Sequence, residues 1–114
     1  MKRLKSLHST YAVKTTGHSL GGALAHLTAL ALIKDGIPTT MINFGQPRTG
    51  NPAFATFSAT KLTSFRVVHY QDIVPHIPST TPISYHHVKT EMYEDLNHSV
   101  RACDSSGEDP TCAD

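Results

Sequence analysis

A serine flanked by two glycines is the feature of this sequence that could carry chemistry. It lies in the run Gly17-His18-Ser19-Leu20-Gly21, which matches the pattern G-x-S-x-G. In that pattern the serine occupies a sharp turn between a strand and a helix, and a glycine on each side prevents a collision with neighbouring backbone. The turn exposes the hydroxyl for nucleophilic attack on a carbonyl carbon. The backbone N–H of Leu20 is then predicted to be one donor of an oxyanion hole.

The elements that such a turn requires are present on both sides of it. Residues 11–16 form a β-prone run that predicts a strand, and residues 20–35 form an apolar run long enough for a helix. Because this helix has no polar face, we expect it to be buried on all sides. His26 lies on this helix and is expected to be a core histidine with satisfied polar atoms.

The alternation of strands and helices continues along the chain. Residues 39–44 and 64–70 are predicted strands, and residues 51–61 between them are a predicted helix that buries its two phenylalanines. Asn51 is the expected N-cap of this helix. Such alternation predicts an α/β fold, with a mostly parallel sheet and flanking helices.

The two ends of the chain give weaker patterns. The first residues predict the tail of a surface helix, with Leu4 and Leu7 facing inward. Residues 85–93 alternate loosely and suggest one arm of a hairpin. The chain from Asp95 onward is polar and is expected to be irregular.

Asp72 is the second candidate for chemistry. It follows the third predicted strand and precedes a loop bounded by prolines. In parallel sheets with helices the chemistry lies at the carboxyl ends of the strands, and both Ser19 and Asp72 fall there. Asp72 could therefore orient a histidine as the acid of a catalytic triad. The alternative is a loop aspartate that only accepts backbone N–H bonds.

Three segments of the sequence resemble the fungal-type class 3 lipases. They are residues 16–25 (TGHSLGGALA), 43–51 (NFGQPRTGN) and 68–78 (VHYQDIVPHIP), in the family's order and spacing. The resemblance implies an α/β-hydrolase fold and hydrolysis of carboxylic esters, typically acylglycerols, through an acyl-enzyme. It implies no metal or organic cofactor, and it matches Asp72 to the acid of the family's triad. The family also includes phospholipases and feruloyl esterases, which remain alternative activities. Thioesterases and acyltransferases share the serine motif but are disfavoured by the other two segments.

The base of the triad is not evident in the sequence. In this fold the histidine follows the acid, and four histidines follow Asp72: His76, His86, His87 and His98. None has the context of the family's catalytic histidine, which the resemblance places beyond Asp114. The family's lid and second oxyanion donor precede the serine and are also missing. Residues 1–114 are therefore expected to be a single partial domain that is inactive alone, and a non-catalytic truncated fragment is the competing interpretation.

The composition excludes several classes of partner. The net charge is +1, from ten basic and nine acidic side chains, with no basic stripe suited to nucleic acid. No apolar run reaches the roughly 18 residues of a membrane-spanning helix. The expected partner is a lipid or other ester substrate, and a lipid would imply contact with an oil–water interface.

The two cysteines, Cys103 and Cys112, lie in a polar, turn-rich segment. Zinc sites usually need a second close pair, which is absent from the sequence. Two unrelated reduced thiols are the alternative, but the polar, turn-rich setting favours a local disulfide and, from it, a secreted protein. Asp104, Glu108 and Asp109 in the same segment lack the spacing of a calcium loop and are expected to form a solvated turn.

Overall fold

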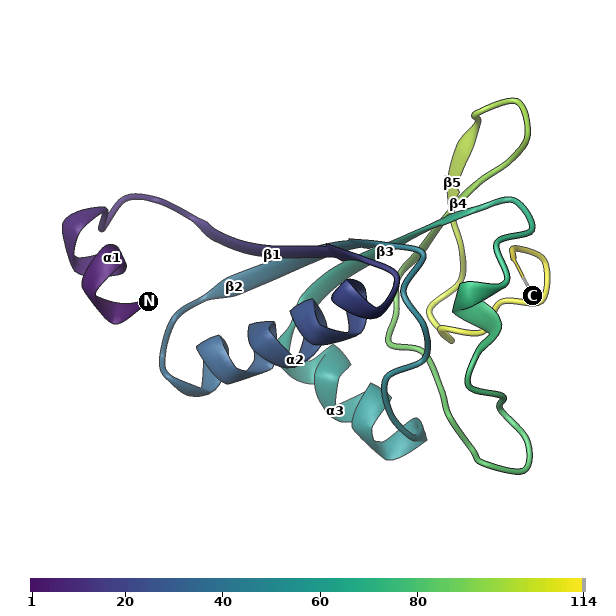
Figure 1. The fold of residues 1–114 in the computed structure, drawn as a ribbon, viewed down its shortest axis with the longest axis horizontal. Helices are drawn as coiled ribbons and strands as arrows, with labels where there is room; N and C mark the ends of the chain where they lie inside the picture. The colour runs from purple at the N-terminus through teal and green to yellow at the C-terminus, as the bar shows by residue number, and fades with distance from the viewer. Residues whose placement is uncertain (114) are drawn as a thin grey trace.

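A computed structural model describes residues 1–113 of the chain as a mixed α/β structure (Figure 1). The elements are α1 (Lys2–Leu7), β1 (Val13–His18), α2 (Leu20–Lys34), β2 (Thr39–Phe44), α3 (Pro52–Lys61), β3 (Thr63–His69), the 3-10 helix η1 (Val74–His76), β4 (Glu91–Glu94) and β5 (Val100–Ala102). None of the helices in this part of the chain has the length and apolar character needed to cross a membrane.

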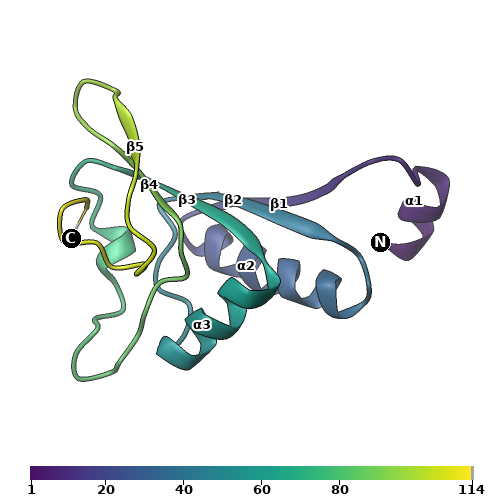
Figure 2. The same ribbon diagram turned by 180° about the vertical axis from the view of Figure 1, so that it is seen from behind.

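The strands form one five-stranded sheet in the order β1-β2-β3-β4-β5. The first four strands are parallel, and β5 pairs antiparallel with β4. Helices α2 and α3 both lie on the same face of the sheet (Figures 1 and 2). The predicted α/β fold with a mostly parallel sheet and flanking helices is confirmed, with the helices confined to one face.

The core lies between the sheet and these two helices. Ala29 of α2, Met41 of β2, Leu62 and Val88 form a buried apolar cluster. Helix α3 begins as predicted, because the Asn51 side chain accepts a hydrogen bond of 2.9 Å from a backbone N–H in its first turn.

Helix α2 is not buried on all sides, which corrects the sequence-based expectation. Leu20, Leu24 and Leu27 are 68%, 57% and 48% exposed. In the described chain the sheet and α3 cover one side of this helix, so its apolar outer stripe faces outward. Phe57 of α3 is exposed for the same reason, because only one side of a helix can face a single sheet.

Three further expectations were wrong in detail. Leu4 and Leu7 do not face inward, because α1 contains no buried residue. Residues 85–93 become a strand only from Glu91, and that strand pairs parallel to β3 as well as forming a hairpin with β5. The segment after Asp95 contains β5, which cross-strand pairing creates in an exposed and polar sequence.

Candidate active site

Ser19 lies on a strained turn between β1 and α2. Its backbone has φ 54° and ψ −129°, in the left-handed half of the conformational map that non-glycine residues rarely adopt. Its N–H donates to the Phe44 carbonyl at the end of β2, at 3.0 Å, and its own carbonyl accepts from Gly22 N–H at 2.9 Å. These bonds hold the serine at the carboxyl end of the sheet and compensate for the strain.

The glycines around Ser19 differ in their steric role. A Cβ on Gly17 would lie 2.1 Å from the Gly21 carbonyl oxygen, so no other residue fits there. A Cβ on Gly21 would meet nothing within 4 Å in the described chain, so the collision predicted for the second glycine is wrong. The tight approach is at Gly22 instead, where a Cβ would lie 3.1 Å from Gln46 Cβ.

A buried polar network lies beneath this turn and was not foreseen from the sequence. Asn43 Nδ2 donates to the Gly22 carbonyl and to Gln46 Oε1, both at 2.7 Å. Gln46 Nε2 donates to Thr49 Oγ1 at 3.0 Å and lies 3.4 Å from His26 Nδ1. His26 is buried as predicted, but its Nε2 has no partner within residues 1–113. Burial, with a smaller contribution from Arg66, lowers the pKa of His26 from 6.5 to about 4.

Leu20 is the first residue of α2, and the structure places its backbone N–H beside the serine. The first N–H groups of a helix have no acceptor within the helix, and they carry a partial positive charge. The Leu20 N–H is therefore suited to an anion that forms next to Ser19, and its role as an oxyanion donor stays a prediction.

Asp72 lies at the same edge of the sheet as Ser19. Its N–H donates to the His69 carbonyl at 3.0 Å, and its Oδ1 accepts from Val74 N–H at 3.0 Å. Its Oδ2 would lie 2.7 Å from a Cβ on Gly45, a residue with φ 54° that follows directly after β2. One oxygen thus fixes the loop, while the structure gives Oδ2 no hydrogen-bond donor within residues 1–113.

His18 also approaches this edge. Its Nε2 would lie 3.7 Å from the same Cβ position on Gly45 that Asp72 Oδ2 approaches. The imidazole is on the residue before Ser19, at the end of β1. The structure thus brings an imidazole and a carboxylate to the end of β2.

Three of the four histidines after Asp72 are engaged elsewhere. His87 is buried and its Nε2 lies 2.8 Å from the Pro75 carbonyl, while burial and then Arg66 lower its pKa well below the usual range. His86 Nε2 lies 2.8 Å from the Ser106 carbonyl, and His98 Nδ1 lies 2.8 Å from a Glu94 oxygen.

An arginine–glutamate pair supports the loop that carries Asp72. Arg48 donates through Nε and Nη2 to the two oxygens of Glu108, at 2.8 and 2.6 Å. Arg48 Nη1 also donates to the carbonyls of His76 and Pro78 in that loop. Burial would raise the pKa of Glu108, but the hydrogen bonds from Arg48 and from the His87 N–H outweigh it and lower the pKa from 4.5 to about 2. The sequence suggested that Glu108 is part of a solvated turn, and this prediction is wrong.

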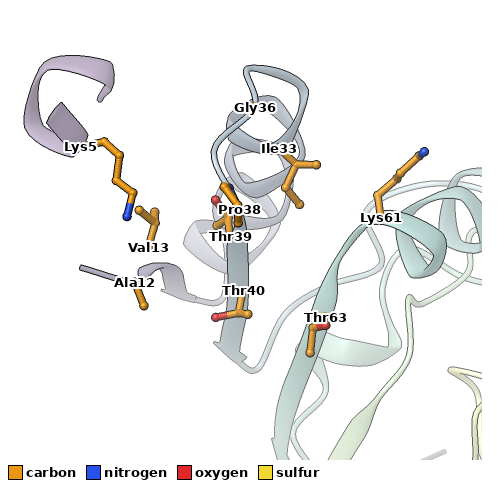
Figure 3. Close-up of a pocket in the computed structure, with 10 residues that line it drawn as sticks. All are labelled: Lys5, Ala12, Val13, Ile33, Gly36, Pro38, Thr39, Thr40, Lys61 and Thr63. Atoms are coloured by element: carbon orange, nitrogen blue, oxygen red, sulfur yellow. The ribbon is translucent and has the colours of Figure 1, made fainter. Parts of the chain in front are cut away.

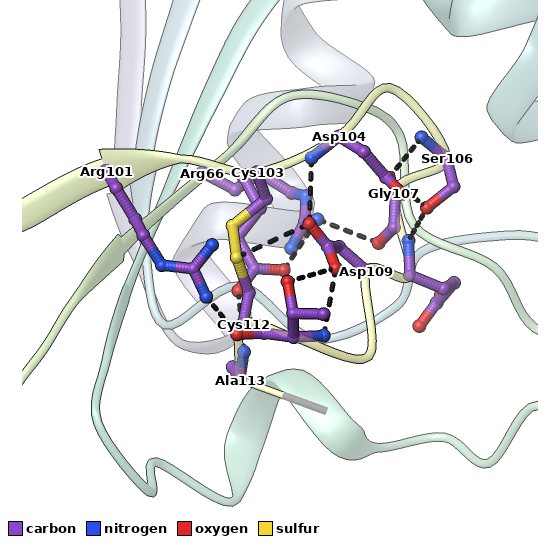
Figure 4. The surroundings of a disulfide bond; sticks show 12 residues. Arg66, Arg101, Cys103, Asp104, Ser106, Gly107, Asp109, Cys112 and Ala113 are labelled. Atoms are coloured by element: carbon purple, nitrogen blue, oxygen red, sulfur yellow. Dashed lines mark hydrogen bonds and ion pairs between the residues drawn. A yellow bond between two sulfur atoms is a disulfide. The ribbon is translucent and has the colours of Figure 1, made fainter.

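The predicted disulfide between Cys103 and Cys112 is confirmed. Figure 4 shows the loop that it closes, in which Asp109 accepts hydrogen bonds from the N–H groups of Asp104 and Thr111. These carboxylate oxygens serve the loop itself, so the expected turn is present. Asp104 is exposed as expected, but Asp109 is buried rather than solvated, which corrects that part of the prediction.

A hollow of about 670 Å³ lies away from these groups (Figure 3). It is lined by Lys5, Ala12, Val13, Ile33, Gly36, Pro38, Thr39, Thr40, Lys61 and Thr63. These residues gather at the amino ends of the first three strands, whereas Ser19 and Asp72 lie at the carboxyl ends. Because chemistry in such sheets sits at the carboxyl ends, this hollow is not the candidate active site.

Comparison with known proteins identifies related sequences and structures. A family model described as lipase (class 3) matches residues 1–81. The secreted mono- and diacylglycerol lipase 1 of Fusarium solani is 39% identical over 92 residues, which are 80% of this chain and 27% of that protein. The chain thus spans less than a third of this curated relative.

Solved structures of lipases share the fold. Lipase II from Rhizopus niveus superposes with a TM-score of 0.89 at 32% identity, over 98% of this chain and 44% of that one. A triacylglycerol lipase whose structure is described as having a serine protease triad for its catalytic centre superposes with a TM-score of 0.84 at 34% identity, over 92% of this chain and 42% of that one. The sheet and helices described above therefore have the α/β-hydrolase arrangement.

Proposed function

Because this chain belongs to the class 3 lipase family, we propose that it carries the nucleophile and the acid of a serine esterase that hydrolyses lipid esters. The observation that carries the proposal is the strained Ser19 turn and the Asp72 carboxylate at one edge of the sheet. Asp72 Oδ2 has no donor among the described residues, which leaves it open to orient an imidazole.

The proposed reaction passes through an acyl-enzyme. Ser19 Oγ attacks the ester carbonyl, and an imidazole held by Asp72 takes the serine proton. The Leu20 N–H donates to the oxyanion of the tetrahedral intermediate. The imidazole returns the proton to the leaving alcohol, and it then activates a water that releases the fatty acid. We assign the imidazole to a histidine outside the described residues, because the side chains of His86, His87 and His98 are engaged elsewhere.

An acylglycerol is the proposed substrate, met at an oil–water interface. The Fusarium relative is named as a mono- and diacylglycerol lipase, which supports this class. The exposed leucines of α2 begin at Leu20, next to the serine, and would suit contact with an apolar phase. The disulfide and the secreted relative support a secreted protein.

Labelling with a fluorophosphonate probe tests the nucleophile. In a protein that joins this chain to the proposed base, Ser19→Ala should abolish both labelling and ester hydrolysis, while Ser105→Ala, at an exposed serine of the disulfide loop, should leave both unchanged. Labelling that survives Ser19→Ala would remove this serine from the mechanism. A series of acylglycerols, phospholipids and feruloyl esters then identifies the ester class.

Turnover of an Asp72 variant tests the acid. In a protein that joins this chain to the proposed base, Asp72→Asn should lower turnover by several orders of magnitude, on the scale of about 10⁴ that the corresponding change causes in a serine protease. Asp35→Asn, at the C-cap of α2, is the matched control and should keep full turnover. An Asp72→Asn variant within about threefold of the parent would place the acid elsewhere.

Expression of residues 1–114 alone tests the assignment of the base. We expect a background rate equal to that of its own Ser19→Ala variant, because a triad without its base loses nearly all turnover. If this chain hydrolyses esters and the variant does not, a histidine within it is the base, and a non-catalytic fragment is excluded.

A further inference from the structure

Two histidines and a glutamate meet beside β3 and β4, outside the proposed triad. His69 is the last residue of β3, Glu94 is the last residue of β4, and His98 lies in the turn between β4 and β5. Their ligand atoms all lie within 4.8 Å of one another. His98 Nδ1 is 2.8 Å from Glu94 Oε1, and the rings of His69 and His98 stack with centroids 6.1 Å apart.

The register of the sheet places the first two side chains together. His69 and Glu94 are direct partners in the parallel pairing of β3 with β4, so their side chains project from the same face. Their backbones are held by the ladder, because the Tyr70 N–H donates to the Glu94 carbonyl at 2.8 Å. The backbone positions of two of the three groups are therefore fixed before any ligand binds.

The turn between β4 and β5 presents the third group. Asp95 Oδ1 accepts from the N–H groups of Asn97 and Ser99 at 2.8 and 3.0 Å, and the Asp95 carbonyl accepts from His98 N–H at 3.0 Å. These bonds hold His98 at φ 61°, a left-handed conformation that places its ring over Glu94. The hydrogen bonds within the turn thus fix the backbone that carries this imidazole.

The chemistry of the three groups is that of a zinc site. Two imidazole nitrogens and one carboxylate oxygen are a ligand set that proteins use for Zn²⁺, with a water in the fourth position. Bonds of about 2.0–2.2 Å bring ligand atoms closer together than the 4.8 Å limit observed here, and the exposed His69 and His98 rings are free to rotate inward. Within residues 1–113, a second cluster of this kind, Glu91 with Cys103 and Cys112, cannot bind a metal ion through its sulfurs because both form the disulfide.

We propose that His69, Glu94 and His98 bind a zinc-like divalent ion that links the β4–β5 turn to the end of β3. Asp72 lies three positions after His69, so the ion would also stabilise the start of the loop that carries the proposed acid. The ion takes no part in the proposed ester hydrolysis. Binding can therefore be measured whether or not the protein hydrolyses esters.

Titration of the untagged protein with ZnCl₂ in a calorimeter tests the proposal. We expect one ion per chain, and a melting temperature that rises with zinc concentration. His98→Asn retains a residue that tolerates the left-handed backbone, and His69→Gln changes an exposed side chain, so both variants should fold. Each should weaken zinc binding by about tenfold or more, the scale on which even residues that only support a ligand act. His8→Asn, at an exposed histidine beside Tyr11, is the control and should bind zinc like the parent.

Cobalt spectroscopy provides a second measurement on the unaltered protein. Co²⁺ should give the visible absorption of a bound, nitrogen-ligated ion, and equimolar ZnCl₂ should displace it. Absence of zinc binding, or binding that is unchanged in both His98→Asn and His69→Gln, would overturn the proposal. In that outcome Glu94 and His98 are only a surface ion pair.

Discussion

Acid should destabilise this protein through His26, beneath the Ser19 turn. The fold lowers the pKa of His26 from 6.5 to about 4, because burial disfavours the charged ring. Between these two values the unfolded chain binds a proton that the folded chain does not, so the free energy of unfolding decreases as the pH falls. It is unaffected above pH 6.5, and the loss is complete below about pH 4.

The size of the loss follows from the shift. One pKa unit corresponds to about 1.4 kcal/mol, so the full shift corresponds to about 3 kcal/mol, of which about 2 kcal/mol is lost between about pH 7 and about pH 5. His26→Gln removes the titrating group but retains an amide that can reach Gln46. The free energy of unfolding of this variant should therefore fall by about 2 kcal/mol less than that of the parent over the same range.

Urea unfolding at several pH values between about 7 and about 5 measures this difference. His87→Gln is the control, because the pKa of His87 is also lowered by burial and this histidine contributes to the same pH range. The control should lose the contribution of His87 while keeping that of His26. A pH dependence that is the same in His26→Gln and the parent would refute the reasoning, since it would mean that His26 is protonated as readily in the fold as in the unfolded chain.

Three further changes test other parts of the site. Gly17→Ala should lower the free energy of unfolding by roughly 1–3 kcal/mol or more and reduce fluorophosphonate labelling, whereas Gly21→Ala should be tolerated, because only the first substitution meets backbone; thermal melts of the pair decide this. In the parent, ionised Glu108 stabilises the loop fully above pH 4.5, and this stabilisation is lost as the pH falls towards about 2. Glu108→Gln should remove it, so proteolysis of the loop should be faster than in the parent at neutral pH. The rate of proteolysis should also depend less on acid than in the parent. Mass spectrometry of unreduced peptides should show Cys103 linked to Cys112, and Cys103→Ser should lower the melting temperature; two free thiols would contradict the structure.

Local sequence signals predicted the elements around Ser19 well. The strand at residues 39–44 has the predicted bounds, and the helix after Asn51 begins at its predicted cap. These features depend on alternation, on proline and on a capping side chain, all of which act within a few residues. The first strand, predicted over residues 11–16, lies two residues later, since turn signals fix a strand's limits only loosely.

Features that depend on distant residues could not be predicted in the same way. Glu108 and Arg48 are 60 residues apart, and nothing near either residue in the sequence indicates that they pair. β5 is exposed along its length and exists because it pairs with β4. The apolar pattern of α2 predicts that the helix is in contact on every side. Which side is covered depends on the elements that pack against the helix, and in the described chain these lie on one side only.

The backbone at the carboxyl edge of the sheet determines where Ser19 and Asp72 lie. The Ser19 N–H donates to Phe44 at the end of β2, and the N–H of the next residue, Gly45, donates to Val67 in β3. Asp72 then packs against Gly45, where a larger residue would collide with its carboxylate. Because each contact joins the end of one strand to the next, neither proposed catalytic side chain holds the other in place. Removing the Ser19 hydroxyl should therefore abolish chemistry without moving Asp72, which makes the loss of labelling in Ser19→Ala a test of the nucleophile alone.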